Sequence, residues 1–357
     1  MILFSDFHAD AHSEFAQPWK DGCNTRLKSQ LDVLAQIFRI ATEECEDTIV
    51  FLGDWFHRWK AVDTAVASMV SKTLYDLLNK NRDIRLVMMP GNHDMPNKNV
   101  PGVSTIDPYS AHPSIQVISS PSVVEIDGHP CAFVPYLSDH TAMRDNALAL
   151  GKKASNMWLF SHIDIVGAVA SIDGYTATGG VALEDLDIFA GGVFGHYHMP
   201  QDFTSKGMKN FHYVGSPMQL SWVDEQAGKD AEDIRGVISL VCGEINRVTI
   251  DSPKFVKVPY DYAGPLRSQD YHMISCDIQN AEEVHKMWSQ KFSGDGNFRI
   301  NPSKKEEEKS KTVLYRTSPA EDAIDTYAKT RGHMCECDLA TLISYGKFYY
   351  AGGSVSE

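Results

Sequence analysis

Five apolar runs along this chain are each followed by residues that can bind a metal ion. The run at 48–52 has the length and composition of a buried strand, and Gly53 and Asp54 follow it directly. A Gly-Asp pair after a strand is common in turns, so this pair alone indicates little. The whole series is much harder to obtain by chance. It comprises Asp6-Phe7-His8, Gly53-Asp54, Gly91-Asn92-His93-Asp94, Ser161-His162 and Gly195-His196-Tyr197-His198.

The spacing of the apolar runs predicts an α/β fold. Runs at 1–6, 48–52 and 84–89 alternate with amphipathic segments that begin near Asn24 and Asp63, both residue types that often cap helices. Strand, helix, strand, helix and strand at this spacing favour parallel βαβ units. The carboxyl ends of parallel strands meet at one edge of a sheet, where ligands bind. We therefore expect the five motifs to lie together.

Shorter runs predict a second sheet stacked on the first, with helices outside. Asp127-Gly128 has the composition of a hairpin turn, and residues 139–150 fit a helix. The runs at 211–214, 236–241 and 245–250 are expected to be antiparallel strands that complete the second sheet.

The sequence divides into four predicted parts. We expect a main domain at 1–252 and a small α/β domain at 253–303, with strands at 255–259 and 271–278 and a helix at 281–292. The Lys/Glu-rich stretch at 304–317 is typical of a solvated linker. Two helices are predicted within 318–357, the first beginning at a capping box over 318–321.

Composition limits the class of protein. A net charge of −14 argues against a protein that merely coats nucleic acid, but an acidic metal cleft becomes cationic once loaded. Seven irregularly spaced cysteines predict no disulfide framework, and Cys335-Glu336-Cys337 lacks the spacing of a zinc knuckle. The same cysteine pattern makes the cytoplasm, of a bacterium or a phage-infected host, the expected compartment. No apolar run has the length of a membrane span.

The motif residues form a ligand set for two metal ions. Aspartate, asparagine and histidine without thiolates suit manganese, iron or similar ions. A pair of ions can clamp a phosphate if one carboxylate bridges them, and Asp54 is the candidate. Taken singly, Asn92 also fits a turn residue and His162 a structural histidine. The predicted ligands are Asp6, His8, Asp54, Asn92, His162, His196 and His198.

The motif series resembles that of the calcineurin-like metallophosphoesterases, a family that implies a four-layered α/β/β/α sandwich and two divalent metal ions, with Mn²⁺ expected. Three features are similar to SbcD-type DNA repair nucleases and their bacteriophage recombination-endonuclease relatives. They are His57, the Gly215-Ser216-Pro217 segment, and a small capping domain followed by terminal helices. Asp10 departs from that branch, which often has glycine there.

The resemblance implies a role for each motif residue. It assigns one ion to Asp6, His8, Asp54 and His198, and the other to Asp54, Asn92, His162 and His196. It implies that His93 protonates the leaving oxygen or stabilises the transition state, with Asp94 orienting His93. His57 is expected to position the phosphate or the DNA end.

The same resemblance implies DNA as substrate and an SMC-like ATPase subunit of SbcC type as partner, docked on the helices of 318–357. Whether the chain forms a homodimer stays open. The expected phosphate contacts are Arg58, Lys60, Lys98, Lys206 and Lys209.

Two other functions are compatible with parts of the pattern. A small-molecule phosphodiesterase or phosphatase would use the same metal core. The protein phosphatases of the superfamily carry Gly-Asp-x-x-Asp-Arg-Gly and Gly-Asn-His-Glu, however, where this chain has His57 and Asp94. A non-enzymatic scaffold is expected to have lost ligands, whereas this chain has a residue at every ligand position.

Overall fold

The computed structural model describes residues 1–98, 102–154, 156–170, 175–203, 210–224, 234–292 and 297–303. Residues Met1–Pro302 form one compact unit. The predicted linker at 304–317, the predicted helices of 318–357, Lys206 and Lys209 lie outside the described residues.

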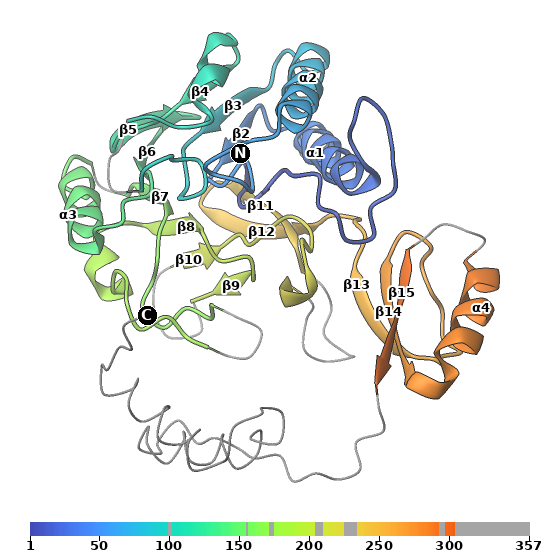
Figure 1. Ribbon diagram of the computed structural model, residues 1–357. Helices are drawn as coiled ribbons and strands as arrows, with labels where there is room; N and C mark the ends of the chain where they lie inside the picture. Colours follow the sequence, from blue (N-terminus) through green and yellow to red (C-terminus); the bar gives the residue numbers. More distant parts are fainter. Residues whose placement is uncertain are drawn as a thin grey trace, which may run out of the picture. The chain divides into compact units, whose positions relative to one another are not determined.

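The first sheet has the strand order β12-β11-β1-β2-β3-β4 (Figure 1). Four of its strands are parallel: β1 (Ile2–Phe4), β2 (Thr48–Phe51), β3 (Arg85–Met88) and β4 (Ile115–Val117). Helices α1 (Thr25–Glu43) and α2 (Thr64–Lys80) connect the first three. Their N-caps are Asn24 and Asp63, whose side chains accept hydrogen bonds from backbone N–H groups of the first turn. The predicted βαβ units are therefore confirmed.

The second sheet has the order β5-β6-β7-β8-β10-β9. Its strands are β5 (Ser122–Ile126), β6 (His129–Val134), β7 (Trp158–His162), β8 (Gly191–Gly195), β9 (Gln201–Asp202) and β10 (Asn210–Tyr213). The predicted hairpin joins β5 to β6, and Asp127 and Gly128 both have positive φ there, as a type I′ turn requires. Helix α3 (His140–Gly151) begins after the N-cap Asp139.

The last strands of the main domain are confirmed in part: β11 and β12 form an antiparallel pair and β10 belongs to the second sheet, but the sheet predicted for 236–250 is wrong. Strand β10 is parallel to β8, and the hairpin of β11 (Gly236–Val241) and β12 (Glu244–Thr249) joins the first sheet beside β1. Five of the six residues of β11 are buried, so the run has no polar face to indicate its sheet. The N-terminal strand β1 needs a neighbour on its open side, and β11 supplies it.

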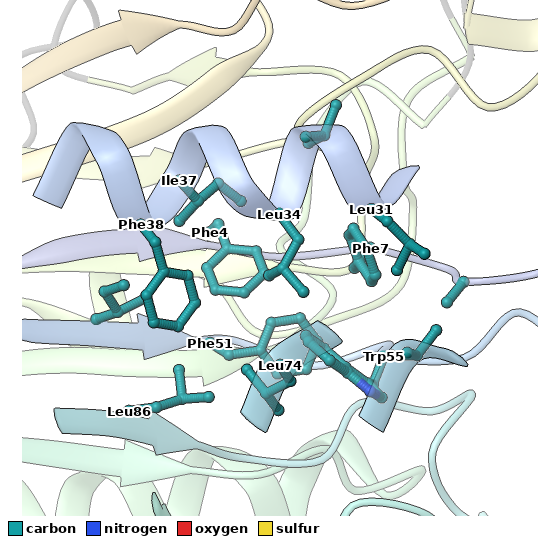
Figure 2. Packing of buried hydrophobic residues seen from close by; sticks show 14 of the residues in the cluster. Phe4, Phe7, Leu31, Leu34, Ile37, Phe38, Phe51, Trp55, Leu74 and Leu86 are labelled. Atoms are coloured by element: carbon teal, nitrogen blue, oxygen red, sulfur yellow. The ribbon is translucent and has the colours of Figure 1, made fainter. Parts of the chain in front are cut away.

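The two sheets pack face to face with helices outside. Alternate residues of the first sheet point to opposite faces: Phe4 and Phe51 pack against α1, whereas Leu3 and Val50 contact the second sheet. Figure 2 shows Leu34, Ile37 and Phe38 of α1 over Phe4 and Phe51. On the second sheet, Leu159 packs against α3. This is the expected α/β/β/α sandwich.

A third sheet, of order β13-β14-β15, follows residue 252. It comprises β13 (Phe255–Pro259), β14 (Tyr271–Asp277) and β15 (Phe298–Ser303), and α4 (Ala281–Lys291) contributes Trp288 to a separate core with Val258 and Ile274. Strand β15 is not predicted by the sequence pattern, and the boundary near 252 stays a prediction.

Short 3-10 helices complete the described part of the chain; they span Asp107–Ala111, Leu183–Leu186, Trp222–Asp224 and Ile278–Asn280. No helix of the described residues is both long and apolar enough to cross a membrane. The cysteines of this part, which are Cys23, Cys45, Cys131, Cys242 and Cys276, are all free.

Candidate metal centre

The candidate ligands converge from the carboxyl ends of both sheets. On the first sheet, Asp6 and His8 follow β1, Asp54 follows β2 and Asn92 follows β3. The second sheet contributes His162, the last residue of β7, together with His196 and His198 after β8. All seven predicted ligands are thus brought to one place, as expected for side chains at the carboxyl edges of parallel strands.

One group of ligand atoms comes from Asp6, His8 and His198, and these atoms lie within 4.8 Å of one another. The Nε2 atoms of His8 and His198 are 3.1 Å apart. His198 donates its Nδ1 proton to Asp224 (3.1 Å), so in the neutral ring Nε2 carries the lone pair. Burial lowers the pKa of His8 well below its usual value, which favours the neutral, ligating ring. A cation fits between two such nitrogens.

A second group surrounds His162. Its Nδ1 donates to the Leu52 carbonyl (2.8 Å), so the Nε2 of the neutral ring carries a lone pair directed at the Asn92 Oδ1, 2.9 Å away. His196 directs its Nδ1 at the same oxygen, also at 2.9 Å. Although burial lowers it, the pKa of His162 is raised to about 9 by Asp54. A metal ion would take the place of that proton and satisfy all three acceptors.

Asp54 lies between the two groups. Its Oδ2 is 3.5 Å from the Nε2 of His8 and 3.5 Å from the Nε2 of His162, one nitrogen from each group. Its Oδ1 accepts a hydrogen bond from the His93 backbone N–H (2.7 Å). Although burial raises it, the two histidines hold the pKa of Asp54 well below its usual range. This is the position that a bridging carboxylate requires.

The backbone is strained at four candidate ligands. Asp6, His8, Asp54 and His196 have positive φ angles of 53°, 46°, 66° and 107°. Each costs on the order of 1–3 kcal/mol in a residue with a side chain. Cross-loop hydrogen bonds hold them, since the Asp6 and His8 N–H groups donate to the carbonyls of Gly53 and Asp54, both at 2.9 Å. The fold therefore shapes the site before any ion binds.

Two glycines permit the close approach of the strand ends. A Cβ atom on Gly195 would lie 2.0 Å from the Ser5 Oγ and 2.6 Å from the Leu52 carbonyl oxygen. On Gly91, it would lie 2.2 Å from the Asp54 Oδ1. Gly91 and Gly195, which precede the candidate ligands Asn92 and His196, are thus required by the packing of the site.

The profile of the calcineurin-like phosphoesterase family matches residues 1–200 of the sequence, which contain every candidate ligand. The chain belongs to the calcineurin-like phosphoesterases. Enzymes of this family are hydrolases that use divalent metal ions. Two groups of Asp and His side chains fit that requirement, Asp6 with His8 and His198, and Asp6 with Asp54 and His162, since the ligand atoms of each group lie within 4.8 Å of one another.

Similar solved structures include a dimetal phosphatase from Danio rerio, at 12% identity, covering 60% of this chain and 86% of that one with a TM-score of 0.40. A second is the nuclease MPE of Pseudomonas putida, at 15% identity, covering 69% and 86% with a TM-score of 0.29. Neither similarity bears on the substrate of this phosphoesterase. No curated protein matches its sequence.

Two further histidines stand beside the ligands of the phosphoesterase. His93 donates its Nδ1 proton to the His57 carbonyl (2.7 Å), and its ring centroid is 4.8 Å from that of His8. The rings of His57 and His93 are stacked with centroids 6.0 Å apart. Because Nδ1 is committed to a carbonyl, Nε2 is the atom of His93 that can exchange a proton with substrate.

The role predicted for Asp94 is corrected by its contacts. One oxygen accepts from the N–H groups of Asp54 (2.7 Å) and Gly91 (2.9 Å), and the other from the Trp55 N–H (2.9 Å) and Thr105 Oγ1 (3.2 Å). The carboxylate is fully buried and braces the turn that carries Asp54, while the His57 carbonyl orients His93. Asp94 and His93 are adjacent in the sequence, which suggested that they pair, but in the structure each has a different partner.

We expect Asp94→Asn to lower the free energy of unfolding by on the order of 2–4 kcal/mol. The amide nitrogen of asparagine cannot accept a hydrogen bond, so buried N–H groups that now donate to a carboxylate oxygen would lose their acceptor. Metal affinity should fall as well, since the Asp54 turn is released. Urea unfolding and Mn²⁺ titration check both effects. Asp107→Asn is the matched control: Asp107 likewise accepts from Ser104 and Ser119, but in a loop without ligands, so it should alter stability alone.

Asp164 and Asp224 were not predicted from the sequence as site residues. Asp164 accepts from the Nε2 of His196 (3.0 Å), and Asp224 from the Nδ1 of His198 (3.1 Å). Each carboxylate thereby fixes which ring nitrogen is free for a metal ion. Asp164 follows His162 by two residues, a signal that could have been used. Asp224 stands 26 positions after His198, and no local sequence signal links the two residues.

The Gly215-Ser216-Pro217 segment of the phosphoesterase contacts the backbone of His198. Ser216 donates its N–H to the His198 carbonyl (3.0 Å), and Gly215 has a φ of 82° with no room for a Cβ atom beside that carbonyl. The N–H groups of Leu220 and Ser221 donate to Asp224. The segment therefore positions one metal ligand, which explains its place after the last motif.

Asp224→Asn is expected to weaken Mn²⁺ binding at one of the two sites by about 10- to 100-fold, because His198 loses the partner that fixes its tautomer. Calorimetric titration of the metal-free protein measures this. Asp202→Asn is a suitable control, since Asp202 accepts from the Nδ1 of His212 (2.6 Å), a histidine outside the site. Equal affinities in both variants would contradict the role of Asp224.

Proposed function

We propose that this phosphoesterase is a metal-dependent DNA nuclease that hydrolyses phosphodiester bonds as an exonuclease and endonuclease. The observation that carries the proposal is a cleft of about 560 Å³ that bears cationic side chains and is lined by His57 and His93, whose rings lie 5.6 and 4.8 Å from that of the candidate ligand His8. Its lining comprises Asp10, His12, Ser13, His57, Arg58, Trp59, Lys60, Ala61 and His93.

The composition of this cleft suits a polymeric phosphodiester. The lining contains Arg58, which pairs with Asp10, and Lys60, three residues after His57. Although the net charge of the chain is −14, a cation is thus placed where a phosphate backbone would enter. Binding to DNA relies on such cations to neutralise phosphates. The Gly-Ser-Pro segment is weaker support, because its contacts explain it as a brace for His198.

Each residue of the site has a proposed role in metal binding or in catalysis. Asp6, His8, Asp54 and His198 would hold one ion, and Asp54, Asn92, His162 and His196 the other, with Mn²⁺ expected for both. When bound, two such ions polarise the phosphate and activate water. His93 donates a proton from Nε2 to the leaving oxygen, and His57 orients the phosphate at the mouth of the cleft.

One observation favours the alternative of a small-molecule phosphodiesterase or phosphatase. A second cavity, of about 360 Å³, is lined by Tyr136, Leu137, Met95 and Lys98 among others. The Tyr136 ring centroid is 6.0 Å from that of His196. A cavity of this size, with an apolar wall and a few polar groups, accommodates a nucleoside-sized substrate.

The test compares four substrates with the full chain and Mn²⁺: single-stranded DNA, duplex DNA, a cyclic nucleotide and a generic aryl phosphodiester. A nuclease should have a much higher kcat/KM for DNA than for the aryl diester, because the cleft adds contacts to the polymer. Faster turnover of the cyclic nucleotide, with DNA left intact, would overturn the proposal in favour of the alternative.

We further propose that the protein is the nuclease subunit of an SbcCD-like complex, with the helices predicted in 318–357 docking on the SMC-like ATPase. These helices are short and isolated helices of that length are marginal in water, so a partner surface would stabilise them. Deletion of 312–357 is expected to abolish co-purification with the ATPase while leaving Mn²⁺-dependent cleavage of short single strands unchanged. Continued co-purification, or loss of that cleavage, would contradict an independent docking module.

A further inference from the structure

The cleft beside the metal centre contains one large aromatic side chain, Trp59. From its surroundings we infer that the Trp59 ring is a stacking platform for an unpaired nucleobase, with Lys60 and Lys98 binding the phosphates that flank it. The inference rests on the proposed nuclease function and specifies the substrate as single-stranded DNA next to the scissile bond.

The loop that carries Trp59 is fixed to the metal centre. His57 and Trp59 are two residues apart and line the same cleft as His93. The His57 N–H donates to the Ala9 carbonyl (3.3 Å), and Ala9 forms a parallel bridge with Phe56. The backbone just before Trp59 is thus paired with the ligand-bearing segment after β1, which places the Trp59 loop beside the metal centre.

Asp10 gives the loop a second attachment. Its buried carboxylate pairs with the Arg58 Nε at 3.2 Å, and its backbone N–H donates to the Gln30 side chain (3.1 Å). Asp10 is the position at which this chain departs from the nucleases it resembles, and its partner lies next to Trp59. The Arg58 charge is thereby compensated, so the lysines are the cations left to meet phosphates.

Two lysines lie over the Trp59 ring. The Lys60 Nζ is 4.5 Å and the Lys98 Nζ 5.7 Å from the Trp59 ring centroid. Within the part of the chain that the structure describes, neither ammonium group has a carboxylate partner. An aromatic ring with cations beside it is the composition of sites that bind single strands, where bases stack and the backbone follows the charges. Base stacking is stronger than an exposed cation–π contact, so a base can displace a lysine toward its phosphate.

Stacking on Trp59 selects for unpaired bases. A base inside a duplex has both faces covered by its neighbours, whereas one in a single strand or a frayed end exposes a face to the ring. A small phosphodiester without a base gains nothing from the platform. The contribution of Trp59 should therefore appear in the KM for DNA and be absent with a substrate that lacks nucleobases.

The first experiment compares Trp59→Ala and Trp59→Phe with the unaltered full chain in Mn²⁺, on a single-stranded oligonucleotide and on methyl para-nitrophenyl phosphate. We expect Trp59→Ala to lower kcat/KM for the oligonucleotide roughly 10- to 100-fold, mainly through KM, and Trp59→Phe to retain most of it. The small diester should be cleaved equally by all three. Trp19→Ala is the matched control, because Lys20 lies 4.7 Å over that ring and Trp19 does not line the cleft.

The second experiment removes bases one at a time from the oligonucleotide and compares the unaltered chain with Trp59→Ala. With the unaltered chain, removal of the base at one position near the scissile bond should raise KM by about as much as Trp59→Ala does. With Trp59→Ala, removal of the base at that one position should leave KM unchanged. Equal cleavage of the oligonucleotide by Trp59→Ala and the unaltered chain would overturn the inference. So would a loss from the abasic residue that adds in full to the loss from Trp59→Ala. If Trp59→Ala does not fold, a flat abasic profile with the unaltered chain overturns it. Failure of the unaltered chain to cleave DNA would instead overturn the proposed function.

Discussion

Replacement of Asp54 by alanine is expected to abolish phosphodiester hydrolysis and to leave the protein with at most one tightly bound metal ion. Its Oδ2 is equidistant, at 3.5 Å, from a nitrogen of each ligand group, so one substitution removes a ligand from both ions. Metal analysis after dialysis, together with calorimetric titration of Mn²⁺, measures the loss. Two ions still bound to the alanine variant would rule out a bridging Asp54.

A second variant separates ligation from loop structure. The Asp54 Oδ1 also accepts from the His93 N–H, so alanine releases the turn that carries His93 as well. Asp54→Asn retains an oxygen for that hydrogen bond but lacks the second carboxylate oxygen. It should weaken the binding of both ions as alanine does and remain inactive, because both variants lack the shared Oδ2, while the turn that carries His93 stays in place. An active asparagine variant would show that the Oδ2 of Asp54 is not needed.

His93→Ala is expected to keep both ions and to lower kcat by about 10²- to 10⁴-fold, the range typical of general acid catalysis. The His93 ring is held by the His57 carbonyl and is not needed to complete either ligand group, so the effect should fall on the chemical step. Steady-state kinetics with metal analysis of the same sample provides the measurement. A fully active, metal-loaded variant would give His93 a structural role.

The leaving group distinguishes acid catalysis by His93 from simple charge stabilisation. A DNA alkoxide needs a proton as it leaves, whereas para-nitrophenolate does not. The loss in His93→Ala should accordingly be larger for DNA than for an aryl phosphodiester. Equal losses on both substrates would mean that His93 stabilises the phosphate rather than the leaving oxygen.

The candidate ligands can be proposed from the sequence, and the structure brings them together, because their signals are local. Each ligand follows an apolar run within a few residues, and N-caps such as Asn24 and Asp63 mark the helices between them. Parallel strands then place their carboxyl ends together without further information. The positions of Asp6, Asp54 and His162 follow from chain order and handedness alone.

Features set by contacts between distant segments were not predictable in this way. The buried strand β11 has no polar face, so its period does not indicate which sheet it joins. Asp224 reaches His198 across a loop, and Asp94 turns to backbone N–H groups instead of its neighbour His93. Strand β15 has the sequence Phe-Arg-Ile-Asn-Pro-Ser, whose few apolar residues do not resemble a strand.

In the proposed assignment each ion takes ligands from both sheets, and the layer between the sheets is apolar. Leu3 and Val50 on one side and Phe160 and Val193 on the other make up that layer. Their volumes set the gap between the sheets, and hence how far the histidines after β7 and β8 stand from the carboxylates after β1 and β2. The apolar layer is thus a spacer for the metal pair. A change in the volume of these side chains is therefore expected to alter the geometry of the metal centre, several residues away, as well as stability.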